Sequence, residues 1–299
     1  MPRLLNLGSL CIDRVYQVDK IATAGETVSS KSFAIYPGGK GANQSLAAAT
    51  AGADVYHHGL LGEDGEWLLD VLCQGGVNAD GVFVLLESET GHAVIQVDEA
   101  GQNSIVIVGG ANRQISLDMM EKVIRSMQDD DWLLLQNEIN DLETILELSA
   151  NHRRHVAFNV APVDGREQNY DLANVEILIV NEIEAGALSA TSNPIESLEV
   201  LCTRYPDTHV VLTEGADGLR YGLGSLRHQL PAFKVQAVDE TAAGDAFIGY
   251  FMASVLRGDD MLEAIQHGSI AGAYAVTKPG AGVSIPTTSQ FKEFKKTLS

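Results

Sequence analysis

The chain has 299 residues, of which 45% are hydrophobic and 20% charged, which is typical of a globular protein with a substantial core. Its 40 acidic and 20 basic residues give a net charge of −20, which argues against nucleic acid or an anionic membrane as the main partner. Cys11, Cys73 and Cys202 form no Cys-x-x-Cys pair, so neither a disulfide framework nor a zinc site is expected. These scattered cysteines fit a reducing compartment best. No run approaches the roughly 18 apolar residues that span a membrane, so a cytoplasmic location is expected.

Strands and helices are expected to alternate along most of the chain. Strand-like segments are residues 3–13, 29–36, 55–62, 131–136, 155–162, 175–181 and 209–218, the last ending in a turn. Helix-like segments are residues 43–53, 65–76, 141–152 and 194–205. This alternation predicts a doubly wound α/β fold around a parallel sheet, with ligands outside the carboxyl ends of the strands.

One segment departs from this alternation. Residues 91–108 read as two strands around EAGQN, with no helix between them. Together with residues 14–36 they could form a small separate sheet, which would serve as a lid or a dimer surface. The alternative is a hairpin that extends the main sheet. We therefore expect one domain over residues 1–299, with lid segments at about 14–36 and 91–108.

The stretch DETAAGDAFIGYF at residues 239–251 places three small residues between two acids. Apolar residues at positions 247, 251 and 255 recur at helical spacing, which predicts a helix beginning near Ala242. The first N–H groups of such a helix carry the positive end of its dipole, and small side chains let a phosphate approach them. Asp245 could then act as a base toward a nearby hydroxyl. The alternative is a capped helix, with Thr241 as N-cap and Asp245 favoured by the dipole.

A second glycine cluster, PGGKGANQSLAAA, occupies residues 37–49. It is not a phosphate-binding P-loop, because Lys40 is followed by Gly41, and it fails the dinucleotide pattern at Gln44. A glycine turn at a helix start nevertheless allows a ligand to come close, and Lys40 and Asn43 can donate hydrogen bonds to it. The alternative is an ordinary turn with a surface lysine.

Taken together, the two clusters resemble the paired signatures of the ribokinase, or PfkB, family of sugar kinases. The resemblance covers nearly the whole chain and includes GSLCID, TGHAVIQVDEAGQNSIVIVGGAN, LLLQNEI, NEIEAG, LTEGADG and KPGAGVSIP in family order. QNSIVIVGGAN and VQAVDETAAGDAF are most similar to the ribokinase branch. The resemblance implies a doubly wound, mainly parallel sheet flanked by helices, with a small β-sheet lid. It also implies magnesium-dependent transfer of the γ-phosphate of ATP to a primary hydroxyl of ribose or a ribose-like sugar.

The resemblance also assigns roles on the sugar side. Asp245 matches the family's catalytic base, and the N–H groups that match its anion hole belong to Ala242, Ala243 and Gly244. The residues that match sugar contacts are Asp13, Gly39, Lys40, Asn43 and Glu138. Taken alone, Asp13 and Asn43 could equally be caps, and Glu138 a solvated carboxylate at a strand end.

On the nucleotide side, Asn181 and Glu184 match an Asn-x-x-Glu motif that organises magnesium around the phosphates, although their spacing also fits an ordinary helix start. The residues that match the loop beside the nucleotide are Thr213, Gly215 and Gly218, with Ser269 near adenine. The positions that match ligands of an activating potassium ion are Asp239, Thr241, Ala275, Lys278, Gly280 and Ser284, which otherwise read as turn residues.

Two residues depart from the family pattern. Cys11 replaces an asparagine that contacts the sugar, and Glu240 replaces a usual threonine beside the potassium positions. A thiol is a weak hydrogen-bond partner, so the choice of sugar stays open at this point. The alternatives are a nucleoside kinase, a kinase of another keto-sugar, or a sugar-binding regulator without catalysis, which the retained Asp245 argues against.

Overall fold

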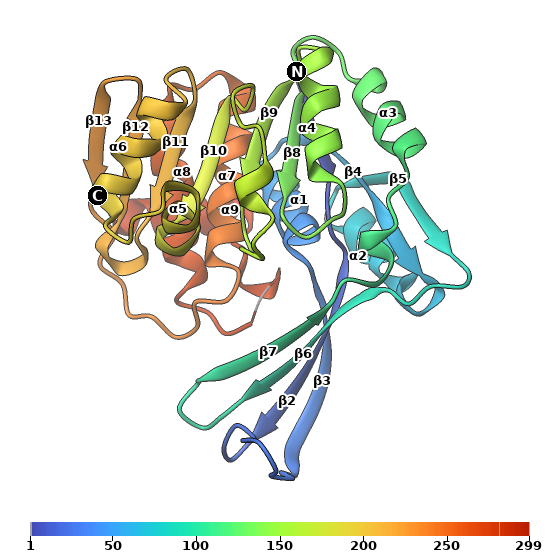
Figure 1. Cartoon of the computed structure of the whole chain (residues 1–299). Helices are drawn as coiled ribbons and strands as arrows, with labels where there is room; N and C mark the ends of the chain where they lie inside the picture. Colours follow the sequence, from blue (N-terminus) through green and yellow to red (C-terminus); the bar gives the residue numbers. More distant parts are fainter. Residues whose placement is uncertain (1, 281, 299) are drawn as a thin grey trace.

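The computed structural model describes residues 2–280 and 282–298 and forms two sheets (Figure 1). The larger has nine strands, in the order β13-β12-β11-β10-β9-β8-β1-β4-β5. Neighbours from β5 to β11 are parallel, and β12 and β13 are antiparallel. The strands are β1 (Arg3–Leu7), β4 (Asp54–Gly62), β5 (Asn78–Leu85), β8 (Trp132–Gln136), β9 (His155–Asn159), β10 (Ile177–Asn181), β11 (His209–Thr213), β12 (Leu219–Leu223) and β13 (Leu226–Leu230).

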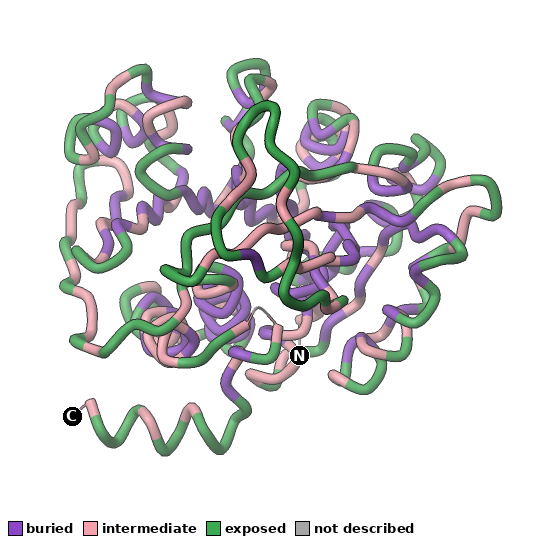
Figure 2. Tube along the Cα trace, turned by 90° about the horizontal axis from the view of Figure 1, so that it is seen from below, coloured by how far each residue is buried: buried purple, intermediate pink, exposed green. Residues whose placement is uncertain are grey.

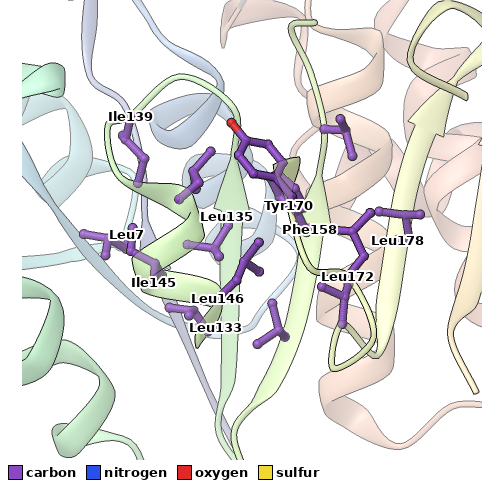
Figure 3. Packing of buried hydrophobic residues seen from close by; sticks show 14 of the residues in the cluster. Leu7, Leu133, Leu135, Ile139, Ile145, Leu146, Phe158, Tyr170, Leu172 and Leu178 are labelled. Carbon is purple, nitrogen blue, oxygen red and sulfur yellow. The ribbon is translucent and has the colours of Figure 1, made fainter. Parts of the chain in front are cut away.

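Helices cover both faces of this sheet, because alternate strand residues pack into two different cores. Leu5 and Leu7 of β1 contribute to one core and Leu4 to the other. Figure 3 shows part of the first core. It is formed with α3 (Leu117–Ser126), α4 (Leu142–Asn151), α5 (Glu182–Ser189) and α6 (Pro194–Arg204). The second is formed with α1 (Lys40–Thr50), α2 (Trp67–Gln74), α7 (Ala243–Arg257) and α8 (Met261–Ala275), and α9 (Thr288–Thr297) packs on α8. The predicted doubly wound, mainly parallel sheet is therefore confirmed.

The second sheet has four strands in the order β3-β2-β6-β7 and extends away from the main body (Figure 1). Its strands are β2 (Cys11–Val18), β3 (Ser30–Gly38), β6 (Gly91–Val97) and β7 (Asn103–Val108). Much of it is exposed (Figure 2), including the side chains of Phe33, Ile35, Ile105 and Ile107. The predicted small separate sheet is confirmed, and residues 91–108 do not extend the main sheet.

Two predicted boundaries are wrong, and both lie at the glycine turns of the site. The strand predicted over residues 3–13 ends at Leu7. At the next residue, Gly8, the chain passes so close to α1 that a side-chain carbon would lie 2.9 Å from Gly41 Cα. Cys11 and Asp13 therefore belong to β2 of the small sheet. The alanine-rich helix begins at Lys40 instead of residue 43. The predicted helix start near Ala242 is confirmed, since Ala242 is the N-cap of α7, with a left-handed φ of 58°; the alternative with Thr241 as N-cap is not what the structure shows.

No helix in the described residues is long and apolar enough to span a membrane.

Candidate active site

The glycine turn before α1 is held against two loops at the end of the main sheet. Gly39 has a φ of 92°, which favours glycine, and the next N–H, of Lys40, donates to Glu138 Oε2 at 2.9 Å. Ser9 donates a short hydrogen bond to the same carboxylate oxygen and accepts from the Gly41 N–H at 3.1 Å. A side-chain carbon at Gly41 would lie 2.4 Å from the Ser9 nitrogen, so only glycine fits there. The turn after β3 is thereby hydrogen-bonded to the loop after β1, which carries Ser9, and to the loop after β8, which carries Glu138.

The start of α7 lies beside this turn, which brings together two motifs about 200 residues apart in sequence. Asn43 Nδ2 donates to Asp245 Oδ2 at 3.2 Å, and Gln44 Nε2 donates to Asp245 Oδ1 at 2.9 Å. Helices α1 and α7 pack so closely at Gly249 that a side-chain carbon there would lie 2.3 Å from Ala47 Cβ. Asp245 is only 8% exposed. The acid and the glycine turn therefore form one site.

The ammonium group of Lys40 interacts electrostatically with four carboxylates. Burial lowers the pKa of Lys40, but the charges of these four carboxylates raise it by more, so the net pKa is above its usual value. The carboxylates belong to Asp245, Glu138, Glu184 and Asp13. Burial, reinforced by Glu138 and then Asp245, raises the pKa of Asp13 to about 6. Burial raises the pKa of Asp245 as well, although the Lys40 charge opposes it. The lysine therefore remains charged and partly neutralises the cluster.

A cavity of about 210 Å³ opens at the carboxyl ends of β9, β10 and β11, where ligands bind in sheets of this kind. Its walls include the last residues of those strands and several predicted site residues: Asn159, Asn181 and Thr213, with Lys40, Glu184, Ala242, Gly244 and Asp245. Glu240 is exposed and also lines the cavity. Lys40 and Asp245 therefore connect this cavity to the carboxylate cluster. A larger cavity of about 580 Å³ lies between β4, β5 and α3 and includes none of the predicted site residues.

The three residues predicted to form an anion hole differ in their surroundings. Ala242 and Gly244 line the cavity, whereas the N–H of Ala243 donates to the Glu240 carbonyl at 3.2 Å. That donor is therefore already used by the turn that precedes α7.

Asn181 and Glu184 form a reciprocal cap at the start of α5. Asn181 Oδ1 accepts from the Glu184 N–H at 2.9 Å, and Glu184 Oε2 accepts from the Asn181 N–H at 2.8 Å. The helix-start alternative is thus present in the structure. Burial raises the pKa of Glu184, opposed by the Asn181 N–H and the Lys40 charge. A buried carboxylate on the cavity wall remains compatible with a role around a metal–phosphate group.

Three other nucleotide-side residues lie outside the cavity wall. Gly215 and Gly218 form a turn after β11, with φ values of 54° and 103°. A side-chain carbon at Gly218 would lie 2.2 Å from the Leu230 carbonyl oxygen, which explains the glycine. Ser269 Oγ donates to the Ile265 carbonyl of its own helix at 2.9 Å.

Asp239 ties together the loops that carry the predicted potassium positions. Its Oδ1 accepts from the Thr241 N–H at 2.9 Å and hydroxyl at 2.6 Å, and its Oδ2 accepts from the Gly280 N–H at 2.8 Å. Ala275 is the last residue of α8, Lys278 Nζ lies 5.4 Å from the Tyr274 ring centroid, and Ser284 is buried. Ala281, within the tail motif, lies outside the described residues. The carboxylate therefore fixes the loop before α7 against the loop after α8.

Cys11 begins β2 and is buried beside the carboxylate cluster. Its Sγ accepts from Asn112 Nδ2 at 3.5 Å, and the Asn112 amide also bonds both backbone groups of Leu10, at 3.0 and 2.9 Å. Burial, with Glu138 and Asp13, raises the pKa of the Cys11 thiol well above its usual value. The thiol therefore stays protonated.

Sequence reasoning missed several polar residues at this site. Ser9, Gln44, Asn112 and Asn159 all make buried side-chain hydrogen bonds there. The available signal was their position: each lies at a strand end or beside a recognised motif, at the sheet edge where ligands bind.

Comparison with known proteins identifies the class that this fold and site define. A model of the pfkB family of carbohydrate kinases matches residues 1–288. The chain is 34% identical over 297 residues to Bacillus subtilis ribokinase, covering 98% of this chain and 99% of that protein. It is 29% identical over 300 residues to a deoxyribokinase of Salmonella typhi, covering 96% and 97%. The structure of Arabidopsis thaliana ribokinase complexed with ribose and ATP matches with a TM-score of 0.85 and 28% identity, covering 99% of each chain.

The chain therefore belongs to the pfkB family of carbohydrate kinases, and the family resemblance of its motifs is confirmed.

Proposed function

We propose that this protein is an ATP-dependent kinase that transfers the γ-phosphate of ATP to a primary hydroxyl of ribose or a ribose-like pentose. The observation that carries the proposal is the position of Asp245, buried at the start of α7 between Asn43, Gln44 and the cavity. The relatives reported above are named ribokinases and a deoxyribokinase, which favours a pentose over a nucleoside or a keto-sugar.

In this proposal Asp245 accepts the proton of the sugar hydroxyl while the hydroxyl oxygen attacks the γ-phosphorus and the bond to ADP breaks. Ala242 and Gly244 present their backbone to the cavity, where they would stabilise the charge of the transferring group. Asp13, Asn43, Gly39 and Glu138 would hold the sugar, since donors and acceptors of these types suit a polyhydroxylated ligand.

Lys40 is assigned to the boundary between the two substrates. It lines the cavity and neutralises the surrounding carboxylates, which is the charge needed where phosphate meets sugar. Thr213, Gly215, Gly218 and Ser269 complete the proposed nucleotide side.

We assign magnesium to the nucleotide phosphates, with Asn181 and Glu184 nearby; the buried Glu184 carboxylate on the cavity wall supports this. A bound Mg²⁺ neutralises phosphate charge during transfer. We assign potassium to the loops joined by Asp239, where the same carboxylate bonds both Thr241 and Gly280. Ala275, Lys278 and Ser284 belong to the same proposed site.

The chain is proposed to be one kinase domain with the small sheet as a lid over the sugar. Its exposed apolar side chains, such as Ile105 and Ile107, favour a second subunit as the cover. Free cysteines support a reducing, cytoplasmic location.

The test is sugar-dependent ADP formation by the purified protein with MgATP. The panel contains ribose, 2-deoxyribose, fructose, a nucleoside and a no-sugar control. The proposal expects one of the two pentoses to give the highest kcat/KM. Preference for the nucleoside or fructose would overturn the pentose assignment, and sugar binding without ADP formation would identify a regulator.

A further inference from the structure

A buried row of amide side chains lies directly behind Asp245. Gln44 Nε2 donates to Asp245 Oδ1 at 2.9 Å and to Asn159 Oδ1 at 3.1 Å. Gln136 Nε2 in turn donates to Gln44 Oε1 at 2.8 Å. Gln44 and Gln136 have no exposed surface, and neither lines the cavity. Gln44 and Gln136 are therefore distinct from the side chains that substrates would touch, whereas Asn159 lines the cavity.

The direction of every amide in this row is fixed by backbone carbonyls at its two ends. Asn159 Nδ2 donates to the Ile179 carbonyl at 3.3 Å, so its oxygen must face Gln44. At the other end, Asn6 Nδ2 donates to the Gly41 carbonyl at 2.8 Å, so its oxygen accepts from Gln136 Nε2 at 3.2 Å. With the Gln136 donor fixed on Gln44 Oε1, the nitrogen of Gln44 must face the carboxylate. A flipped Gln44 would place oxygen against oxygen on both Asp245 and Asn159.

We propose that Gln44 is a positioning residue for the proposed kinase reaction, and that Gln136 acts through it by fixing the direction of its amide. Gln44 keeps the Asp245 carboxylate ionised and holds its orientation. A buried carboxylate is penalised by desolvation, and a donated hydrogen bond favours its charged form. The same balance is present here, since burial raises the pKa of Asp245, whereas Lys40 and the Gln44 hydrogen bond lower it. Asn43 also lowers it, but Asn43 and Lys40 are proposed substrate contacts, whereas Gln44 lies outside the cavity wall.

The charged groups that face Asp245 set the background for a pH test. They are Lys40 of α1, Asp13 of β2 and Glu138 after β8. A substitution at Gln44 leaves all three unchanged, so a difference between variant and parent reports the lost hydrogen bond.

The test compares Gln44→Met, of similar volume, with the parent protein in pH profiles of kcat/KM for the pentose. Loss of a donor raises the pKa of a carboxylate, so the acidic limb of the profile should move to higher pH. The rate below the midpoint should fall about ten- to a hundredfold, with a smaller loss on the alkaline side. Gln136→Met should move the limb in the same direction, and the double variant should shift it no further than Gln44→Met alone.

Ser45→Ala is the matched control. Ser45 is equally buried on the same helix and bonds Asn6 and His57 instead of Asp245. The Gly41 carbonyl, which fixes the direction of the Asn6 amide, is unchanged in this variant. This variant should lose stability without moving the limb. An unmoved limb in Gln44→Met, or an equal loss at every pH, would overturn the proposal.

A second readout needs no turnover and separates this inference from the proposed function. A carboxylate whose pKa is higher in the folded than in the unfolded state makes the protein less stable as pH rises. A further increase in the folded-state pKa makes this loss of stability larger. The difference in Tm between parent and Gln44→Met should therefore grow from pH 5 to pH 8, while that of Ser45→Ala stays constant. A Tm difference independent of pH would contradict the role of Gln44. Absence of sugar-dependent ADP formation in the parent would contradict only the proposed reaction.

Discussion

Replacing Cys11 by asparagine should improve the use of ribose, because the present side chain offers a sugar hydroxyl little. The thiol is 6% exposed and stays protonated, since burial raises its pKa. Its neighbour Asn112 already bonds both Leu10 backbone groups and the sulfur. Neither side chain is therefore a strong hydrogen-bond partner for a hydroxyl facing position 11.

A buried hydroxyl left without a partner costs about 1–3 kcal/mol, which corresponds to roughly ten- to a hundredfold in affinity. Cys11→Asn should raise kcat/KM for ribose by up to that factor. A deoxypentose that carries hydrogen at the facing carbon has no hydroxyl to satisfy, so it should gain little. The similarity to a deoxyribokinase makes this comparison informative.

The assay measures kcat/KM for ribose, 2-deoxyribose and 3-deoxyribose on the parent, Cys11→Asn and a Cys11→Ser control of similar size. The deoxypentose whose kcat/KM does not change identifies the carbon that faces position 11. If Cys11→Asn leaves ribose unchanged or worse, residue 11 does not set the choice of acceptor.

Potassium should raise activity at fixed MgATP through the loops joined by Asp239, and equal rates in potassium and tetramethylammonium would contradict this. Asp13→Asn should raise the KM for ribose, yet raise Tm above pH 6. The Asp13 pKa is raised to about 6 from 3.8, so the native state loses stability as pH rises through that window and the neutral amide avoids the loss. Thermal melts that show no gain at pH 8 relative to pH 4 would disagree. Ile107→Asp on the exposed lid should convert a dimer to a monomer by light scattering, and a monomeric parent would refute the lid interface.

The alternating core of the fold could be predicted because its strands are short apolar runs and its helices have an apolar period. Strands β12 and β13 were not predicted, because polar residues interrupt each five-residue run. These are Arg220 in β12, and Arg227 and Gln229 in β13. Helix α9 has no buried residue in its described part, so it has little apolar stripe to recognise. Amphipathic α3 was also missed, although Ser116 caps it in the expected way.

The candidate site was predictable where glycines and acids mark backbone turns. It was not predictable where tertiary packing decides. Asp13 was expected at a strand end but lies on β2, since three residues suffice to carry the chain from one sheet to the other. Gln44 reads as a polar helix residue, and only the packing of α1 against α7 shows that it is buried against Asp245.

The most direct test of the central claim is the turnover of Asp245→Asn. The amide preserves the shape of the carboxylate but cannot accept the hydroxyl proton, so kcat should fall by about 10²–10⁴-fold. ATP affinity, measured separately by equilibrium binding, should stay within a few fold of the parent. Near-normal turnover in this variant, with ATP binding intact, would contradict the assignment of Asp245 as the catalytic base.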